Sequence, residues 1–414
     1  MRTISSSIGA AAAMPIRPSA GCVSGATVRV NRHAGKAAAT EMFAGGSGWK
    51  GEVIMRAGKR VATWVLAGFL TAASTWLGMI PAYAATPAAS GSLSQLFKRV
   101  DPAVVVIRTS EHVAATVRGE PSGNVMSVAG IGSGVLVSAD GKVVTAAHVV
   151  QTADSVDVEF VSGTVVKARI VASDAAADVA LLQLERVPPH IAPVRFGDSD
   201  KAEVGDQVFI VGAPQGITHT LTVGHVSARR QPKSTHAGLV SAELFQTDAA
   251  INRGNSGSPM FNMNGDVIGI VSHIVSMSGG SEGLGFVVTS NMARRLLLEE
   301  RSVWHGLDGY LITTELARAF NLPMAGLLVQ RVAHGSPAER MGLRGGRYRI
   351  TIENEQLLIG GDVIVAVEGI ELAEPDAYER VRRRLLEVRA SGGMMRLSLI
   401  RDGVLTKLIA NFEP

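Results

Sequence analysis

The chain of 414 residues contains a single cysteine, Cys22, close to its N-terminus. An intrachain disulfide is therefore impossible, which excludes the small disulfide-stapled scaffolds that are common among secreted domains. Domains large enough to bury a full apolar core fold without such bridges. The scarcity of cysteine is thus compatible with export to an oxidising compartment.

Charged side chains make up only 18% of the sequence and aromatic ones 5%, whereas hydrophobic residues make up 46% and glycines number 46. Disordered chains are rich in charge and poor in apolar residues, so this composition favours a globular, β-rich protein. The length predicts two or three domains.

The sequence also lacks a basic region that would serve nucleic acids. Residues 1–60 carry nine basic and two acidic side chains, so the rest of the chain carries 31 basic and 34 acidic ones. The formal charge of +4 therefore belongs to the N-terminal segment, and we expect no nucleic-acid partner. The ten histidines show no metal-ligand spacing and no G-x-x-x-x-G-K-[ST] loop is present, so we expect neither a metal nor another cofactor.

The segment 55–84 has the form of an export signal. A short cationic stretch precedes an uncharged run from Val61 to Ala84, which ends on the small-x-small motif A-Y-A. We interpret it as a signal peptide cleaved after Ala84, followed by a linker at 85–92. A retained membrane anchor is the alternative, because the run can span ~30 Å of hydrocarbon. Residues 1–54 have no evident role, and we hypothesise that translation starts at Met55.

Short apolar runs broken by glycine, aspartate and serine fill residues 104–288. Turn signals such as Asp140-Gly141 join these runs into hairpins. Their spacing without long helices predicts a pair of β-barrels or a β-sandwich, closed by a helix near 291–300. Residues 304–414 mix strand and helix patterns, including a helix over 375–389 and a final hairpin, which predicts a second domain of the α+β class.

The stretch I-N-R-G-N-S-G-S-P-M-F-N at 251–262 carries the strongest chemical signal. A serine hydroxyl is a weak nucleophile that needs a base, an orienting carboxylate and donors for the developing oxyanion. Gly254 and Gly257 flank Ser256 and permit a tight turn that aims amides at one point. Ser256 is therefore a candidate nucleophile rather than a plain turn residue, and the amides of Gly254, Asn255 and Ser256 are candidates for an oxyanion hole.

His148 and Asp178 are the candidates for the base and the orienting carboxylate. His148 ends an apolar hairpin strand, and Asp178 stands directly before another strand. Each could instead serve packing, capping or a turn, and Asp174 is an alternative carboxylate. The order His148, Asp178, Ser256 along the chain is that of a chymotrypsin-like triad, and differs from the orders of subtilisin and the α/β-hydrolases.

Several stretches together resemble the trypsin-like core of the HtrA (Deg) protease family: GIGSGVLVS, TAAHVV, ADVALLQL, VGAPQG, QTDAAINRGNSGSPM and GLGFVVTSN. From residue 307 onward, GLLVQRVAHGSPAERMGL and GGDVIVAVEG resemble the PDZ domain of that family. The resemblance implies a mainly β fold, with a chymotrypsin-like double β-barrel protease domain at 93–303 followed by an α+β PDZ domain at 304–414. It places His148, Asp178 and Ser256 in the cleft between the barrels.

The resemblance also implies an ATP-independent serine endopeptidase that degrades or processes unfolded or damaged proteins and binds peptides through its PDZ domain. Such proteins work in the periplasm, free or anchored to the inner membrane. They usually form homotrimers, and we expect the trimer contact near Leu96 and Phe97, although both residues fit a core role equally well. The alternative function is a catalytically weak or inactive chaperone or scaffold, which Ser258 keeps open because the family usually has glycine there.

Substrate preference follows from the same resemblance. Ala250 stands six residues before the nucleophile, where trypsin-like enzymes have the floor of the S1 pocket, and Ser272 and Ile274 stand in the segment that walls it. An uncharged floor and the bulk of Ile274 predict cleavage after Val, Ala or Leu.

In the PDZ domain, Tyr310, Leu311 and Ile312 are expected to line the peptide groove, with Ile312 where a glycine is common. The stretch 347–360 resembles an insertion within the PDZ pattern.

Overall fold

The computed structural model describes residues 92–411, except 118–119, 232–241, 277, 279, 353–354 and 375. The predicted N-terminal extension and export signal lie outside the described residues, and so does the linker apart from Ser92. Among the helices that the structure describes, none is both long enough and apolar enough to cross a bilayer.

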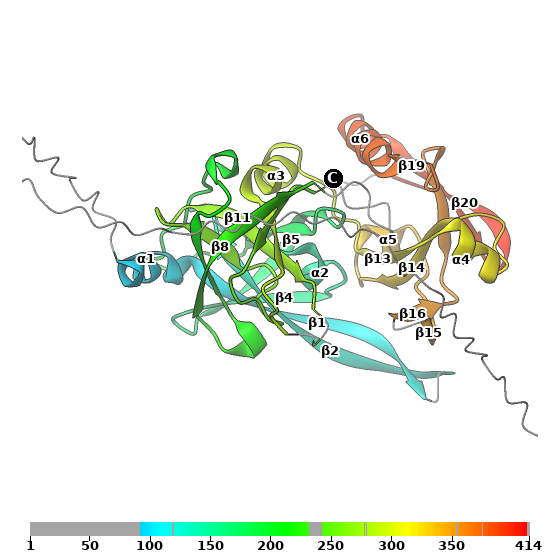
Figure 1. Ribbon diagram of the computed structural model, residues 1–414. Helices are drawn as coiled ribbons and strands as arrows, with labels where there is room; N and C mark the ends of the chain where they lie inside the picture. Colours follow the sequence, from blue (N-terminus) through cyan, green and yellow to red (C-terminus); the bar gives the residue numbers. More distant parts are fainter. Residues whose placement is uncertain are drawn as a thin grey trace, which may run out of the picture. The chain divides into compact units, whose positions relative to one another are not determined.

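A short helix, α1 (Leu93–Val100), begins the described chain (Figure 1). Ser92 and Gln95 form a capping box, in which each side chain accepts a hydrogen bond from the backbone N–H of the other residue. Leu96 is 5% exposed and belongs to the barrel core, and Phe97 packs against that core. The core role is therefore favoured for both residues over the trimer contact that we expected of them.

Two closed antiparallel barrels follow, each of six strands within the described residues. The first has the strand order β1-β2-β3-β6-β5-β4 and the second the order β10-β11-β12-β9-β8-β7. The strands of the first barrel are β1 (Val104–Val117), β2 (Glu120–Leu136), β3 (Lys142–Thr145), β4 (Ser155–Phe160), β5 (Val165–Asp174) and β6 (Val179–Leu184). Those of the second barrel are β7 (Gln207–Gly212), β8 (Thr220–Arg230), β9 (Leu244–Thr247), β10 (Pro259–Asn262), β11 (Val267–Ile274) and β12 (Gly285–Thr289).

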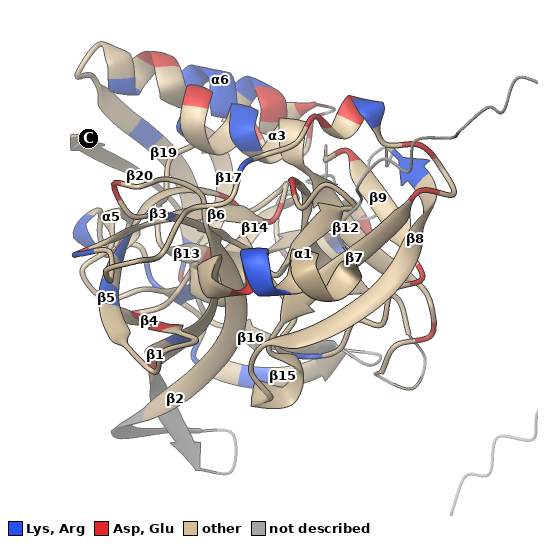
Figure 2. Cartoon of the chain, turned by 90° about the vertical axis from the view of Figure 1, so that its left-hand side faces the viewer, with Lys and Arg blue, Asp and Glu red and all other residues tan. Residues whose placement is uncertain are grey.

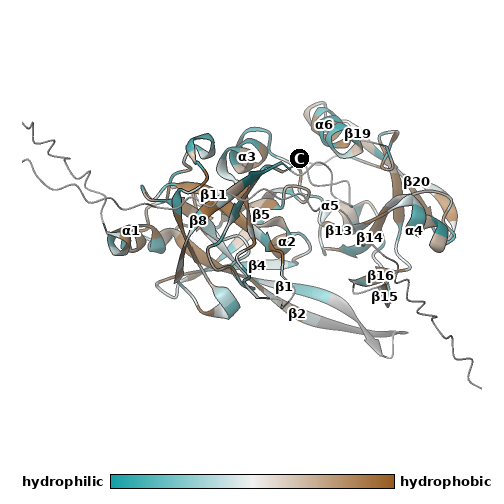
Figure 3. Cartoon of the chain, in the orientation of Figure 1, coloured by the Kyte–Doolittle hydropathy of each residue, from teal (hydrophilic) through white to brown (hydrophobic). Residues whose placement is uncertain are grey.

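Short helical elements connect and close the barrels: η1 (Asp101–Ala103), α2 (Ala147–Val150), η2 (Ser199–Lys201), η3 (Pro214–Gly216), α3 (Ser290–Arg294) and the π-helical η4 (Arg295–Glu299). The last two form the closing helix that the sequence predicts near 291–300. One apolar cluster contains residues of both barrels, and a second cluster fills the second barrel. In the second barrel Phe209 and Phe261 stack with ring centroids 5.0 Å apart. Figure 3 shows apolar residues along the barrel strands, with hydrophilic residues more frequent on loops and on the C-terminal helix α6.

The C-terminal region is a mixed α+β unit. Its main sheet has the order β13-β14-β17-β19-β20, with β18 paired to β17, and its stretch 347–360 forms a separate two-stranded sheet, β15-β16, where the sequence predicts an insertion. The elements are β13 (Leu307–Ile312), α4 (Thr314–Ala319), β14 (Gly326–Val332), α5 (Pro337–Arg340), β15 (Tyr348–Ile352), β16 (Glu355–Ile359), β17 (Val363–Val367), β18 (Ile370–Glu371), α6 (Ala377–Ala390), β19 (Met394–Arg401) and β20 (Val404–Asn411). The fold class predicted from the sequence is confirmed.

Helix α6 carries three consecutive arginines at 382–384, and the first and the last of them pair with acidic side chains. Arg382 pairs with Glu300 and Glu379, and Arg384 pairs with Glu368 and Glu387. Figure 2 shows this alternation of basic and acidic residues along α6. A surface whose charges are neutralised in this way offers little attraction to a phosphate backbone.

Candidate active site

His148 lies on α2, which begins two residues after β3 ends. The sequence pattern had suggested the end of the strand itself, and a helix of four residues is too short to produce a recognisable helical period. The side chain is 51% exposed, so the imidazole can meet a substrate.

Asp178 is bound to the histidine by both side chain and backbone. The backbone of Asp178 is left-handed (φ 56°), a conformation that aspartate tolerates, and it ends the turn before β6. Its Oδ1 accepts from the backbone N–H of His148 at 3.0 Å, and both carboxylate oxygens lie 2.9 Å from His148 Nδ1. A carboxylate accepts only, so Nδ1 must carry the proton and Nε2 is left free to accept another.

The electrostatics of this pair fit a catalytic base. Burial acts to lower the pKa of His148, but the hydrogen bond to Asp178 and its negative charge outweigh burial and raise the pKa above 6.5. Burial acts to raise the pKa of Asp178, but hydrogen bonds from His148 and Ser272 hold it below its ordinary value. Asp178 therefore stays ionised while His148 is poised to take up a proton near neutral pH.

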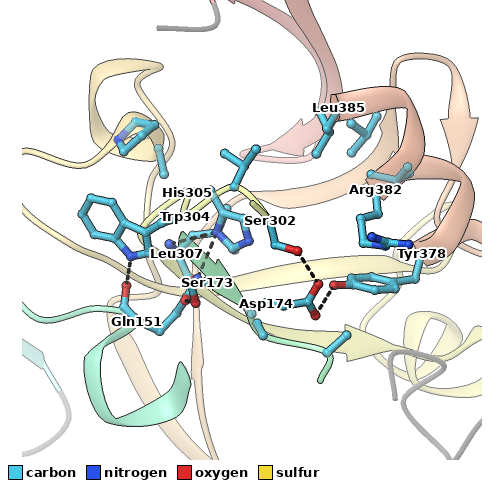
Figure 4. A pocket seen from close by; sticks show the side chains of 18 of the residues that line it. Gln151, Ser173, Asp174, Ser302, Trp304, His305, Leu307, Tyr378, Arg382 and Leu385 are labelled. Carbon is cyan, nitrogen blue, oxygen red and sulfur yellow. Dashed lines mark hydrogen bonds between the residues drawn. The ribbon is translucent and has the colours of Figure 1, made fainter. Parts of the chain in front are cut away.

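Asp174, the alternative carboxylate, has other partners. It is 3% exposed, and its Oδ1 accepts from the Tyr378 hydroxyl at 2.6 Å and its Oδ2 from Ser302 at 3.1 Å (Figure 4). The bond to Tyr378 connects β5 to helix α6 of the C-terminal region. The geometry therefore favours Asp178 as the orienting carboxylate.

Ser256 lies in the turn before β10, and its hydroxyl approaches the carbonyl of Ser272 at 3.5 Å. The hydrogen bonds of the described residues include none between Ser256 Oγ and the ring of His148. Such a bond is often long or absent in an enzyme without substrate and tightens when substrate binds.

The turn that carries Ser256 is fixed through its carbonyl groups. Each carbonyl from residue 253 to residue 256 accepts one hydrogen bond, from Gln215 N–H to Arg253 (2.6 Å), from the Ser133 hydroxyl to Gly254 (2.8 Å), from Ser258 N–H to Asn255 (2.8 Å) and from Ser133 N–H to Ser256 (2.8 Å). The backbone N–H of Asn255 donates to Asn252 at 3.0 Å. In the part of the chain that the structure describes, the N–H groups of Gly254 and Ser256 have no partner.

This arrangement corrects one expectation. Asn255 does not offer its amide to an oxyanion, because the turn already uses that amide. The two unengaged amides, of Gly254 and Ser256, are the oxyanion donors that the geometry supports. Gly254 has φ 98°, and a Cβ there would lie 2.2 Å from the carbonyl oxygen of Ala213, so the turn requires glycine on both grounds.

The Ser272 side chain is turned toward the carboxylate of Asp178. The pairing of β11 with β12 passes from Val271↔Val287 to His273↔Phe286, so Ser272 is the extra residue of a β-bulge. A bulge re-aims side chains, and here the Ser272 hydroxyl donates to Asp178 Oδ2 at 2.5 Å. Ser272 therefore supports the carboxylate.

His273 is a neighbour of the triad that the sequence did not point to. Its Nδ1 lies 3.0 Å from the Ser272 hydroxyl, and its ring stacks on Phe286 with centroids 5.1 Å apart. Since the single hydroxyl proton of Ser272 goes to Asp178, His273 Nδ1 must be the donor in this contact. Burial and the nearby positive charge of His148 lower the pKa of His273 despite Asp178, so His273 is neutral at neutral pH.

The other S1 residues are only loosely defined by the geometry. Ala250 is exposed, and Ile274 is partly buried against the core of the second barrel. The two residues after Ala250 are bound to the loop after β11. Ser281 accepts from Ile251 N–H at 3.3 Å and donates its own N–H to Asn252 at 3.1 Å. The S1 role of Ala250, Ser272 and Ile274 stays a prediction.

Ser258 leaves the nucleophile turn intact. It is fully buried and its N–H donates to Asn255 at 2.8 Å, as the turn requires. Its hydroxyl has no hydrogen-bond partner among the described residues, and the same holds for Asn255 Oδ1. A serine in place of glycine thus changes the polarity of the interior without displacing the backbone.

A cavity of about 1540 Å³ lies where β13 and α6 face the first barrel. Leu311 and Ile312 line it, whereas Tyr310 packs into an apolar cluster of the C-terminal region, and Ile312 is itself only 1% exposed within that cluster. Leu311 fits the expectation, Tyr310 is partly buried against the apolar cluster, and the groove role of all three residues stays a prediction.

The cavity wall also connects to the catalytic helix (Figure 4). Gln151, the C-cap of α2, donates to the Leu307 carbonyl at 3.0 Å and contacts His305 Nδ1 at 3.2 Å. Trp304 donates its indole N–H to the Gln151 carbonyl at 3.1 Å. Burial lowers the pKa of His305 to about 4, which keeps this ring neutral. In the described chain, no group of three or more His, Cys, Asp or Glu residues is placed to hold a metal ion.

Comparison with known proteins shows the family of this chain. Residues 132–270 match the family of trypsin-like peptidase domains. Over 353 residues the chain is 32% identical to the periplasmic pH-dependent serine endoprotease DegQ of Escherichia coli K12, covering 81% of this chain and 73% of DegQ. The chain belongs to the HtrA (Deg) family of trypsin-like serine proteases.

Two further similarities are to a protein of Haemophilus influenzae and to a solved structure. The probable periplasmic serine protease do/HhoA-like of Haemophilus influenzae is 36% identical over 294 residues, covering 69% of this chain and 58% of that protein. A solved structure of the HtrA-type protease AlgW with a tripeptide is 29% identical, covers 78% of this chain and 98% of that one, and has a TM-score of 0.45. The chain spans 58% of the H. influenzae relative and 73% of DegQ. Membership of the family predicted from the sequence is confirmed.

Proposed function

We propose that this HtrA-family protein is an ATP-independent serine endopeptidase of the periplasm that degrades or processes unfolded or damaged proteins. The observation that carries the proposal is the pair of unengaged amides at Gly254 and Ser256, beside a histidine that Asp178 holds in the tautomer of a base. These are the parts that acyl transfer needs.

The reaction follows from these positions. His148 Nε2 takes the proton of the Ser256 hydroxyl as the oxygen attacks the scissile carbonyl, and the amides of Gly254 and Ser256 bind the resulting oxyanion. Asp178 stabilises the imidazolium, which then gives its proton to the leaving amine. Water, activated by the same histidine, releases the acyl group and restores Ser256.

The accompanying proposals concern placement and partners. The curated relatives are named periplasmic, which supports export of this chain. We further propose that peptides bind between β13 and α6, in contact with Leu311. Ala250 and Ile274 favour small or medium aliphatic residues before the cleaved bond. The protein works as a homotrimer.

Cleavage of unfolded casein tests the proposal. The exported protein is compared with Ser256→Ala, each with and without a hydrophobic C-terminal peptide, and the cleaved bonds are mapped by mass spectrometry. We expect cleavage after Val, Ala or Leu that is absent in Ser256→Ala. A folded wild type that fails to cleave, but prevents aggregation of the casein, would support the alternative of an inactive chaperone.

A further inference from the structure

We propose that Ser133 is a positioning residue of the oxyanion hole, acting from the first barrel on the nucleophile turn of the second. The inference rests on the proposed endopeptidase function. Ser133 lies on β2 and is fully buried. Its N–H donates to the Ser256 carbonyl and its hydroxyl to the Gly254 carbonyl, both at 2.8 Å.

The direction of the hydroxyl bond is determined by a third contact. The N–H of Ala213, at the end of the β7 strand of the second barrel, donates to Ser133 Oγ at 3.0 Å. A hydroxyl has one proton, and with Ala213 occupying the acceptor side that proton is directed to Gly254. Ser133 Oγ therefore joins two separate segments of the second barrel.

The hydroxyl acts at the glycine of the turn, the residue with the fewest steric limits on its backbone angles. Gly254 has no side chain and adopts φ 98°, a conformation with few steric limits for glycine. The peptide before it is held by Gln215 N–H on the Arg253 carbonyl, and the peptide after it by Ser133 Oγ on the Gly254 carbonyl. With the carbonyls on both sides anchored, the Gly254 N–H between them is restrained in its orientation.

The anchor is itself rigid. Thr145, on β3 and fully buried, donates its hydroxyl to the Ser133 carbonyl at 2.7 Å. Because the backbone bonds of Ser133 do not depend on its side chain, replacing the hydroxyl removes its bonds to the Gly254 carbonyl and the Ala213 N–H and leaves the Ser256 carbonyl bond in place. The hydroxyl therefore has an effect that can be measured separately.

The test compares Ser133→Ala with Ser290→Ala. Ser290 is a matched control, since it is fully buried and its hydroxyl donates to the carbonyl of a glycine, Gly197, at 2.8 Å, outside the nucleophile turn. Both variants are assayed with a peptide substrate derived from a mapped casein site and with a peptide boronic acid. Ser256 adds to the boron as His148 takes the hydroxyl proton, which gives a tetrahedral adduct that resembles the transition state.

For Ser133→Ala we expect kcat to fall about tenfold, KM to stay within about twofold, and boronate affinity to fall by the same factor as kcat/KM, because a misplaced donor costs less than the 10²–10³ of a deleted one. Ser290→Ala should keep kcat within about twofold. Equal kcat in the two variants, or a change in KM alone, would overturn the inference while the endopeptidase function stands. An inactive folded wild type would instead refute the proposed function, and the inference with it.

If Ser133→Ala does not fold, Ser133→Cys supplies the measurement. The thiol fills the space of the hydroxyl but is a weak donor, so kcat and boronate affinity should again fall together. A folded Ser133→Cys with the kcat of the wild type would contradict the role of the hydroxyl.

Discussion

The two barrels contribute different kinds of parts to the site. The first barrel supplies side chains, His148 and Asp178, which are held to each other by hydrogen bonds and charge. The second supplies Ser256 and two backbone amides, which are held by hydrogen bonds to carbonyl groups. The first half should therefore respond to isosteric changes of charge and to pH, and the second to changes of backbone shape.

Each half is also supported by a serine of the other barrel. Ser272 of the second barrel donates to Asp178, and Ser133 of the first donates to Gly254. The cleft is thus connected across both barrels, and neither half has its final geometry alone.

The largest expected effect tests the half of the site that the first barrel supplies, His148 and Asp178. Asp178→Asn should lower kcat by about 10⁴-fold at neutral pH, because an amide can donate to Nδ1 and so favours the wrong tautomer of His148. Asp174→Asn is the matched control and should keep kcat within a few-fold, while losing about 1–3 kcal/mol of unfolding free energy with its buried bonds to Tyr378 and Ser302. Steady-state kinetics and thermal unfolding measure both. The reverse ranking in kcat would assign the triad to Asp174.

Glycine substitutions test the half of the site that the second barrel supplies, Ser256 and the two backbone amides. Gly254→Ala should lower kcat by about 10²–10³-fold, because the added Cβ would meet the Ala213 carbonyl oxygen at 2.2 Å and displace an oxyanion donor. Gly205→Ala provides the control, since Gly205 has a similar φ of 102° but open space around its Cβ. It should lose about 1 kcal/mol of stability through backbone strain yet keep its kcat. Similar kcat values for both variants would show that backbone strain, rather than the position of the Gly254 amide, lowers kcat.

The smallest expected effect concerns pH. His148 must be neutral to accept the Ser256 proton, and Asp178 raises its pKa above 6.5. Activity should therefore be lost as pH falls, with kcat/KM decreasing about tenfold per unit below a midpoint above 6.5. Because the pKa of His273 is lowered, that ring protonates later, and His273→Phe, which keeps an aromatic ring beside Phe286, should move the midpoint by less than about half a unit. If His273→Phe no longer lost activity at low pH, protonation of His273 rather than of His148 would be the cause of that loss.

Much of the fold and the triad follow from local sequence patterns. Alternating apolar runs predict the strands, and the chain order of His148, Asp178 and Ser256 with the flanking glycines indicates the chemistry. Both signals depend on residues close together in the sequence.

The supporting contacts were not predictable in the same way. The bulge at Ser272 shifts the alternation by one residue, and a period-two pattern carries no mark of such a shift. The Asn255 amide is used by a local turn bond that depends on backbone angles. Ser133 stands 121 positions before Gly254, so no window of sequence contains both.

That separation has a consequence for how the enzyme is made. Contacts between distant parts of a chain form late in folding, since closing a long loop costs entropy before the contact gives any stabilisation. The Ser133 bond to Gly254 can form only after both barrels have closed and docked. We therefore expect the newly exported chain to lack a functioning cleft while it is still unfolded, so that maturation of the fold delays proteolysis and protects the unfolded copies from one another.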